Sequence, residues 1–345
     1  LDDDNGDGRA DEADIPEIVF LTFCGSSFRD DGVLRAIHGG GPNKGGDYFA
    51  NCGGTLWQEG DPLDVSCGCD EADLDSTAGL AAGDLDGNGF PEIVAIGEDD
   101  RIQIFDHTGV EVARSEGEGF GAQNPSPSIA NLDGEGPAEV IVGRDVFTVE
   151  NDGGSWTVVD HFEGDDTVGR NRQGPISCVA DLDGDGRPEI IGGGTAYAYP
   201  RPPAGVTRRS ECTGDESGEA AAWCAGELTV LWDNGHEGFC AVADVLGEDP
   251  TIAPSPANPL DGTPEVLVVD DGRLRIYSAD GTARRNIDYG AGDKGGAPNV
   301  DDFDGDGFPE VGTAFAGEYV LYDLQPPTAA CPAWPNVFED GVGGL

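Results

Sequence analysis

Five short acidic loops of nearly one design recur along this 345-residue chain. They read DDNGDGRAD from Asp3, DLDGNGFPE from Asp84, NLDGEGPAE from Asn131, DLDGDGRPE from Asp181 and DFDGDGFPE from Asp302. Oxygen-bearing side chains stand at loop positions 1, 3 and 5, a carboxylate stands at position 9, and glycines at positions 4 and 6 allow the positive φ of a sharp turn. Alternating oxygens suit a chain that wraps one hard cation, and Ca²⁺ accepts six to eight oxygens in loose geometry. Each loop is therefore predicted to bind calcium.

The candidate ligands are the side chains at positions 1, 3, 5 and 9 and the backbone carbonyl at position 7. In chain order they are Asp3, Asn5, Asp7, Arg9, Asp11; Asp84, Asp86, Asn88, Phe90, Glu92; Asn131, Asp133, Glu135, Pro137, Glu139; Asp181, Asp183, Asp185, Arg187, Glu189; and Asp302, Asp304, Asp306, Phe308, Glu310. About five calcium ions are expected. Asp-Gly runs also form ordinary turns without metal. That alternative is strongest for the third loop, where Asn131 replaces the leading Asp and Glu135 is longer than the usual Asp.

The spacing of the loops predicts a repeated fold. The second, third and fourth loops start 47 and 50 residues apart, within the range typical of repeat architectures. Each loop precedes a short apolar run, and a second run with a turn follows in most copies. The first runs are EIVAIG, EVIVG, EIIGG and EVGTA, and the second runs are RIQIFDHTG, LTVLWDNG and LRIYSADG. Such β-branched runs bounded by Gly, Asp and Asn predict strands and hairpins, and no stretch has sustained helical periodicity.

A degenerate sixth copy, PSPANPLDGTPEVLVV from Pro254, keeps only Asp261 and Glu265 as carboxylates and is expected to bind no calcium. Counting it, the chain contains six repeats of about four strands, with insertions at 38–77 and 195–226. Four-stranded sheets repeated around an axis form a β-propeller. A stacked β-roll with calcium turns would need a period near nine residues, which this sequence lacks. The predicted fold is all-β, one propeller domain over residues 1–345.

The loops and their spacing resemble the FG-GAP or VCBS repeat propellers, which include the N-terminal propeller of integrin α subunits. The dipeptide Phe120-Gly121 before the third loop and the tripeptide Gly296-Ala297-Pro298 before the fifth also match the family. The resemblance implies a closed ring of four-stranded blades with calcium loops on one rim, used outside the cell for adhesion or ligand binding. The family usually has seven blades, so six blades or seven are expected. The first loop matches less well, because EADIPE after Asp11 displaces the usual Pro-Glu.

The charge balance limits the partners. The chain has 68 acidic and 18 basic residues, a formal net charge of −50, and the five loops hold 17 of the carboxylates at ligand positions. Binding to nucleic acid depends on basic residues that neutralise phosphates, so nucleic acid is excluded as a partner. No apolar run reaches the roughly 18 residues of a membrane helix, and no membrane insertion is expected. The chain starts at Leu1 and contains no Met, so a processed or partial protein is expected.

Nine cysteines favour an oxidising, extracellular or cell-surface location. Cys52, Cys67 and Cys69 fall in the first insertion, and Cys212 and Cys224 fall in the second. Both insertions are predicted to be irregular surface loops. A Cys212–Cys224 disulfide is expected, whereas the remaining connectivity stays open. A zinc site from Cys67, Cys69 and His38 is the alternative, but Cys-x-Cys lacks the usual spacing.

Catalytic motifs are missing from the sequence, which contains four scattered histidines, no nucleophile elbow and no phosphate-binding loop. We therefore expect a binding, adhesion or structural module for a protein or glycan ligand, or for neighbouring subunits of a surface assembly, and not an enzyme. The alternative is a polysaccharide lyase or another carbohydrate-active enzyme, because some lyases are propellers with similar calcium loops. The net negative charge disfavours an anionic polysaccharide substrate.

Overall fold

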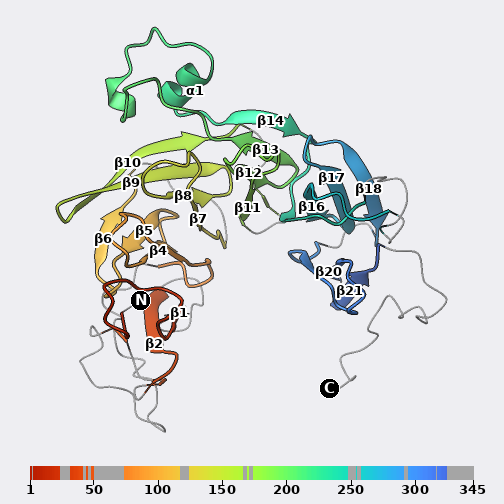
Figure 1. Cartoon of the computed structure of the whole chain (residues 1–345), viewed down its shortest axis with the longest axis horizontal. Helices are drawn as coiled ribbons and strands as arrows, with labels where there is room; N and C mark the ends of the chain where they lie inside the picture. Colours follow the sequence, from red (N-terminus) through yellow and green to blue (C-terminus); the bar gives the residue numbers. More distant parts are fainter. Residues whose placement is uncertain are drawn as a thin grey trace. The chain divides into compact units, whose positions relative to one another are not determined.

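Antiparallel β-strands form nearly all the regular structure in the described part of this computed structural model (Figure 1). The structure describes residues 1, 3–23, 32–41, 44–45, 48–49, 74–116, 124–165, 169–170, 174–247, 254, 258–290, 294–315 and 317–324. Phe120, Gly121, Cys52, Cys67 and Cys69 lie outside these residues, as does most of the first insertion. The all-β prediction is confirmed.

The chain forms two compact units, the first comprising Leu1–Phe162 and Val206–Cys212. Its strands make three sheets, in each of which consecutive strands pair antiparallel. They are β1 (Glu17–Phe23) and β2 (Gly32–His38); β3 (Ala81–Gly83), β4 (Glu92–Ile96), β5 (Ile102–Phe105) and β6 (Glu111–Arg114); and β7 (Ser128–Ala130), β8 (Glu139–Val142), β9 (Asp145–Asp152) and β10 (Ser155–Glu163).

The second unit, Glu163–Gly205 and Thr213–Leu345, also contains three sheets. They are β11 (Ser177–Ala180), β12 (Glu189–Gly192), β13 (Thr195–Ala198) and β14 (Thr229–Asp233); β15 (Phe239–Ala243), β16 (Glu265–Asp270), β17 (Arg273–Ser278) and β18 (Ala283–Asp288); and β19 (Asn299–Asp301), β20 (Glu310–Phe315) and β21 (Glu318–Tyr322). The six sheets match the six predicted repeats one to one, and four of them have the predicted four strands. That the two units form one domain stays a prediction.

The second strand of each four-stranded sheet is buried, apart from the last residue of β16. All five residues of β4 and all four residues of β8 and β12 are buried. These strands read as continuous apolar runs because both faces of the sheet are covered. Within each unit, neighbouring sheets pack face to face. Val94 and Ile104 pack with Val140 and Phe147 in the first unit, and Leu267 packs with the β20 strand in the second.

The second insertion differs from its prediction in two respects. Thr195–Ala198 forms β13, which pairs with β12 and β14, so the predicted boundary at Thr195 is wrong and the insertion starts after this strand. The insertion also contains a 3-10 turn (Arg209–Glu211) and the helix α1 (Glu219–Ala225). The α1 sequence EAAAWCA has high helix propensity, and Gly226 ends it with φ of 76°. In the described part of the chain, neither helix has the length or apolarity to cross a membrane.

A disulfide joins the first strands of two neighbouring sheets in the second unit. Cys178 on β11 and Cys240 on β15 are bonded, with their Cα atoms 6.0 Å apart and a sequence separation of 62. The sequence did not indicate this pair, because connectivity cannot be derived from spacing alone. A cross-link over this separation removes much conformational freedom from the unfolded chain.

Replacing both cysteines, Cys178→Ala with Cys240→Ala, is expected to lower the free energy of unfolding by up to about 4 kcal/mol, the chain-entropy value for a loop of this length. Urea denaturation in saturating calcium measures it. In a reducing agent, which also breaks the bonds of Cys212 and Cys224, the wild-type protein and the variant should be equally stable. A variant as stable as the oxidised wild type would contradict the expectation.

Candidate metal centres

The acidic loops share one network of backbone-to-carboxylate hydrogen bonds. In the fourth loop, Asp181 accepts the amide of Gly184 at 2.7 Å and that of Gly186 at 2.9 Å, while Asp183 accepts the amide of Asp185 at 3.0 Å. Both glycines have positive φ, 77° and 87°. The second and fifth loops repeat these bonds within a few tenths of an ångström. The carboxylate at position 1 therefore organises the turn.

The glutamate at position 9 connects each loop to its sheet. It is the first residue of the following strand, and its Oε2 accepts the backbone amide of loop position 2. The donors and acceptors are Leu85 to Glu92, Leu132 to Glu139, Leu182 to Glu189 and Phe303 to Glu310, at 2.7 to 2.8 Å. All four glutamates are at most 6 % exposed. A buried carboxylate next to an exposed acidic turn is an unusual position for a charge.

Burial perturbs these carboxyl groups. Desolvation, with a smaller contribution from neighbouring carboxylates, raises the pKa of Glu92, Glu139 and Glu310 to about 7. The same causes raise the pKa of Glu189. A cation beside these groups would stabilise their charged forms.

Three loops bring their carboxylates together. The converging sets have one ligand atom from each residue within 4.8 Å of the others: Asp84, Asp86 and Glu92; Asp181, Asp183 and Glu189; Asp302, Asp304, Asp306 and Glu310. In the fifth loop, Oε1 of the buried Glu310 has no hydrogen-bond partner in the described structure. Ca²⁺ fits this donor set, because it takes carboxylate oxygens in variable geometry and would satisfy the unpaired oxygen.

The third loop forms no such carboxylate triad among the described residues. Asn131 accepts the amide of Gly134 at 2.6 Å, as an aspartate would, but its amide nitrogen faces the carbonyl of Gly136 at 3.2 Å. The second oxygen that an aspartate would present is therefore replaced by a donor. Asn131, Asp133, Glu135, Pro137 and Glu139 remain predicted ligands.

In the first loop the structure places Glu17, and not Asp11, where the other loops have position 9. Asp3 accepts the amides of Gly6 and Gly8, so positions 1 to 7 match the other loops. Glu17 begins β1, its side chain is 1 % exposed, and its Oε1 has no hydrogen-bond partner among the described residues. Asp11 instead accepts a nearby amide, that of Ala13.

The sequence contained a signal for Glu17. The tetrapeptide PEIV at 16–19 is identical to PEIV at 91–94, which spans position 9 of the second loop. Residues 10–15 are thus an insertion between loop positions 7 and 8.

The sixth copy has a third carboxylate that the sequence analysis missed. Asp244 directly follows β15 and accepts the amide of Gly262 at 2.8 Å, as position 1 does elsewhere. The amides of Val245 and Leu246 donate to Glu265 at 2.9 and 3.0 Å. Val-Ala-Asp at 242–244 repeats the Val-Ala-Asp that opens the fourth loop at 179–181, which is the signal that could have located it.

This sixth loop is split after position 2 and shortened after position 3. Only three residues separate Asp261 from Glu265, whereas five separate the corresponding residues of the complete loops. Thr263 stands at position 5, because its amide donates to Asp261 as the position 5 amide does to position 3 elsewhere, but it has a hydroxyl in place of a carboxylate or amide, and position 7 has no counterpart. The structure gives no converging carboxylate triad here among the described residues.

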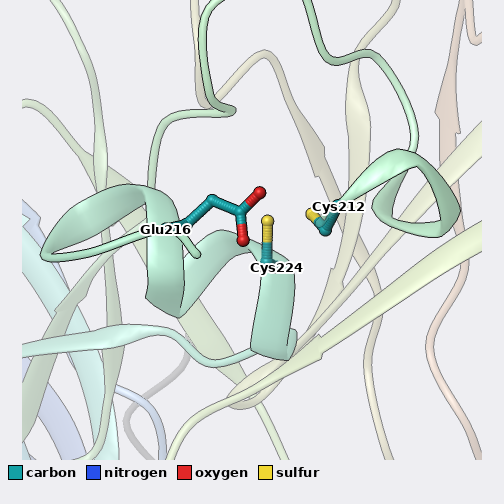
Figure 2. Close-up of side chains that lie close together, drawn as sticks. All are labelled: Cys212, Glu216 and Cys224. Atoms are coloured by element: carbon teal, nitrogen blue, oxygen red, sulfur yellow. The ribbon is translucent and has the colours of Figure 1, made fainter. Parts of the chain in front are cut away.

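Cys212, Glu216 and Cys224 also lie close together in the second insertion, with ligand atoms within 4.8 Å (Figure 2). Both cysteines are disulfide-bonded. Zinc binds cysteine as the thiolate, so these sulfurs are not metal ligands. Glu216 accepts the amides of Thr213 and Gly214, and these bonds lower its pKa to about 2. The cluster fixes the fold of the insertion.

No family model matches this chain, and no curated protein matches it either. Among solved structures, the biofilm matrix protein Bap1 of V. cholerae is similar with a TM-score of 0.53 and 22 % identity, over 87 % of this chain and 42 % of that one. The chain thus spans less than half the length of that protein. The periplasmic gluconolactonase PpgL of Pseudomonas aeruginosa has a TM-score of 0.40 and 13 % identity, over 89 % of this chain and 78 % of that one. The likeness to Bap1 shows a shared propeller-like fold.

The raised pKa values predict how the metal-free protein responds to pH. A carboxyl group whose folded pKa lies above its unfolded pKa contributes stability below the unfolded value, and that stability is lost as pH rises through the folded value. In excess chelator, the melting temperature should therefore rise as pH falls from about 8 to about 5, since burial holds Glu92, Glu139 and Glu310 near pKa 7.

The control is Glu139→Gln, a neutral group of the same shape, which should flatten part of this slope in thermal melts at matched ionic strength. Saturating calcium should reduce the rise in melting temperature at low pH, because the metal competes with protons for the same carboxylates. A chelated protein that melts higher at pH 8 than at pH 5 would disprove the assignment.

Proposed function

We propose that this chain is a calcium-stabilised β-propeller of the FG-GAP or VCBS type that acts outside the cell as a binding, adhesion or structural module. The observation that carries the proposal is the convergence of carboxylates in three loops of one design. The unpaired, buried Oε1 of Glu310 supports a cation in one of them. Calcium is the proposed ion at the four complete loops and at the interrupted first loop, where Glu17 joins the ligands.

The sheets support a ring of blades. Consecutive antiparallel strands form each sheet, and neighbouring sheets within a unit pack face to face through their central strands. A propeller has this arrangement in every blade, and closure leaves only short edges exposed. We propose six blades, one for each sheet, with the calcium loops on one rim.

An extracellular setting is supported by the cysteines and by the fold comparison. Cys178, Cys240, Cys212 and Cys224 are disulfide-bonded, which is typical of oxidising compartments. Bap1, which shares the fold, is a biofilm matrix protein. The proposed partner is a protein or glycan, or a neighbouring subunit in a surface assembly.

Binding is preferred to catalysis because the surroundings of three of the four described histidines are structural. His107 stacks on Phe90 at 4.9 Å. His161 stacks on Phe147 at 4.5 Å and contacts Asp145 at 2.7 Å. Burial lowers the pKa of His236. These contacts account for the three side chains without a reaction.

Calcium is expected to raise the melting temperature, and chelation to lower it. With dissociation constants of about 10⁻⁴ to 10⁻³ M, typical of extracellular modules, three sites at roughly 1 mM calcium contribute about 1 to 4 kcal/mol. Asp183→Ala should remove part of this calcium-dependent gain, since Asp183 belongs to a converging set. Differential scanning calorimetry with and without calcium measures it.

The matched control is Asp261→Ala in the shortened sixth loop. It should leave the calcium-dependent gain intact, although it removes the bond to the amide of Thr263 and lowers stability equally with and without calcium. A melting curve that chelator does not change, or equal loss of the calcium effect in both variants, would overturn the proposal.

A further inference from the structure

The first and second loops line an open pocket that shares Asp84 and Asn88 with the proposed calcium site of the second loop. Its volume is about 610 Å³, and its lining includes Arg9, Ala10 and Asp11 of the first loop together with Asp84, Asn88 and Gly89 of the second. The amide of Ala10 donates to the carbonyl of Gly89 at 2.9 Å, which fixes the two loops against each other. This volume is in the range of small-ligand sites.

Glycines of the second loop keep the pocket open. Gly87 and Gly89 have φ of 76° and 92°, so other residues would be strained there. A Cβ on Gly89 would lie 3.3 Å from Cγ of Arg9, whose side chain therefore passes close over the glycine. A Cβ on Gly87 would meet no atom within 4 Å.

Three polar groups that line the pocket have unused hydrogen-bonding capacity. Within the described structure, the exposed guanidinium of Arg9 has no hydrogen bond or ion pair. Asn88 accepts the amide of Phe90 through Oδ1, which leaves Nδ2 as a donor. Asp11 accepts the amide of Ala13 through Oδ1, which leaves Oδ2 as an acceptor.

The other arginine at loop position 7 shows that an unpaired guanidinium is not a consequence of this position. Arg187 in the fourth loop donates to the carbonyl of Tyr199 at 2.9 Å and lies 3.6 Å from Glu219. In a chain with a net charge of −50, carboxylate partners are abundant. Arg9 nevertheless lines the pocket without one among the described residues.

We propose that this pocket binds a neutral sugar, which rests on the binding role proposed above and names its ligand class and site. Vicinal hydroxyls donate and accept at once, so they match the Arg9 and Asn88 donors beside the Asp11 acceptor. Arg9 has the fixed geometry to bind two adjacent oxygens. With calcium bound, the carboxylates at the ligand positions of each loop still exceed the charge of its ion, and the protein is strongly negative, so an anionic ligand is disfavoured.

The test is a glycan array of neutral and uronate-containing oligosaccharides probed with the whole chain in calcium, followed by titration calorimetry with the best neutral glycan. Arg9→Ala should weaken binding about tenfold or more, the effect of losing a hydrogen bond to a charged group. Ala10→Leu, which fills the pocket without changing charge, should also weaken binding. The control Arg114→Ala makes the same charge change on β6 and should not alter affinity.

Binding to neutral glycans that both pocket variants reduce supports the site. Three outcomes overturn it: no neutral glycan binds, only uronate-containing glycans bind, or Arg9→Ala and Arg114→Ala reduce binding equally. Glycan binding that neither pocket variant changes would leave the binding module in place but remove this pocket from it. Loss of the calcium effect on melting would instead count against the broader proposal.

Discussion

The buried glutamate that begins a strand in each sheet is the constraint on which the rest of the structure depends. In five of the six sheets its carboxylate accepts the amide of loop position 2, whereas in the first sheet Glu17 accepts the ammonium of Leu1. Its backbone belongs to the strand ladder. Transfer of a carboxylate from water to a site such as that of Glu92 is costly unless partners replace the lost hydration. One amide supplies part of this compensation. A divalent cation would supply the rest, so we infer that the folded state of each calcium-binding repeat is coupled to its ion.

Loop position 2 extends this coupling into the core. Leu85 and Leu182 donate their amides to the buried glutamates, and their side chains are at most 3 % exposed. Leu85 packs with Val140 of the following sheet, and Leu182 packs with Val266 of the following sheet. A change in the loop therefore reaches the interface between neighbouring sheets. The acidic turn and the hydrophobic core are adjacent parts of one local structure, joined through a single residue.

The sequence predicted the regular parts of this structure because they depend on local patterns. Each apolar run after a loop is a strand, since β-branched residues between turn residues have few alternatives. Insertions within two loops prevented the prediction of two carboxylates from the sequence. Glu17 and Asp244 belong to interrupted loops. The regular loop spacing, counted forward from Asp3 or backward from Asp261, therefore does not reach either residue. The Cys178–Cys240 bond depends on how two sheets pack, which no local pattern encodes. Helix α1 was missed because seven residues are too few to establish a helical period.

The two interrupted loops show which contacts the motif requires. The first is interrupted between positions 7 and 8, and the sixth between positions 2 and 3, yet both keep the bond from the position 4 amide to the leading carboxylate. Both also keep a buried glutamate at the start of the strand. Insertions are tolerated between these fixed points because the entropy cost of closing a loop grows slowly with its length. The sixth loop lacks a carboxylate or amide at position 5, where Thr263 stands, and lacks a residue at position 7. Hydrogen bonds to Asp244 and Glu265 stabilise its turn. Backbone hydrogen bonding therefore suffices to form the turn, whereas the added oxygens of the complete loops serve the cation.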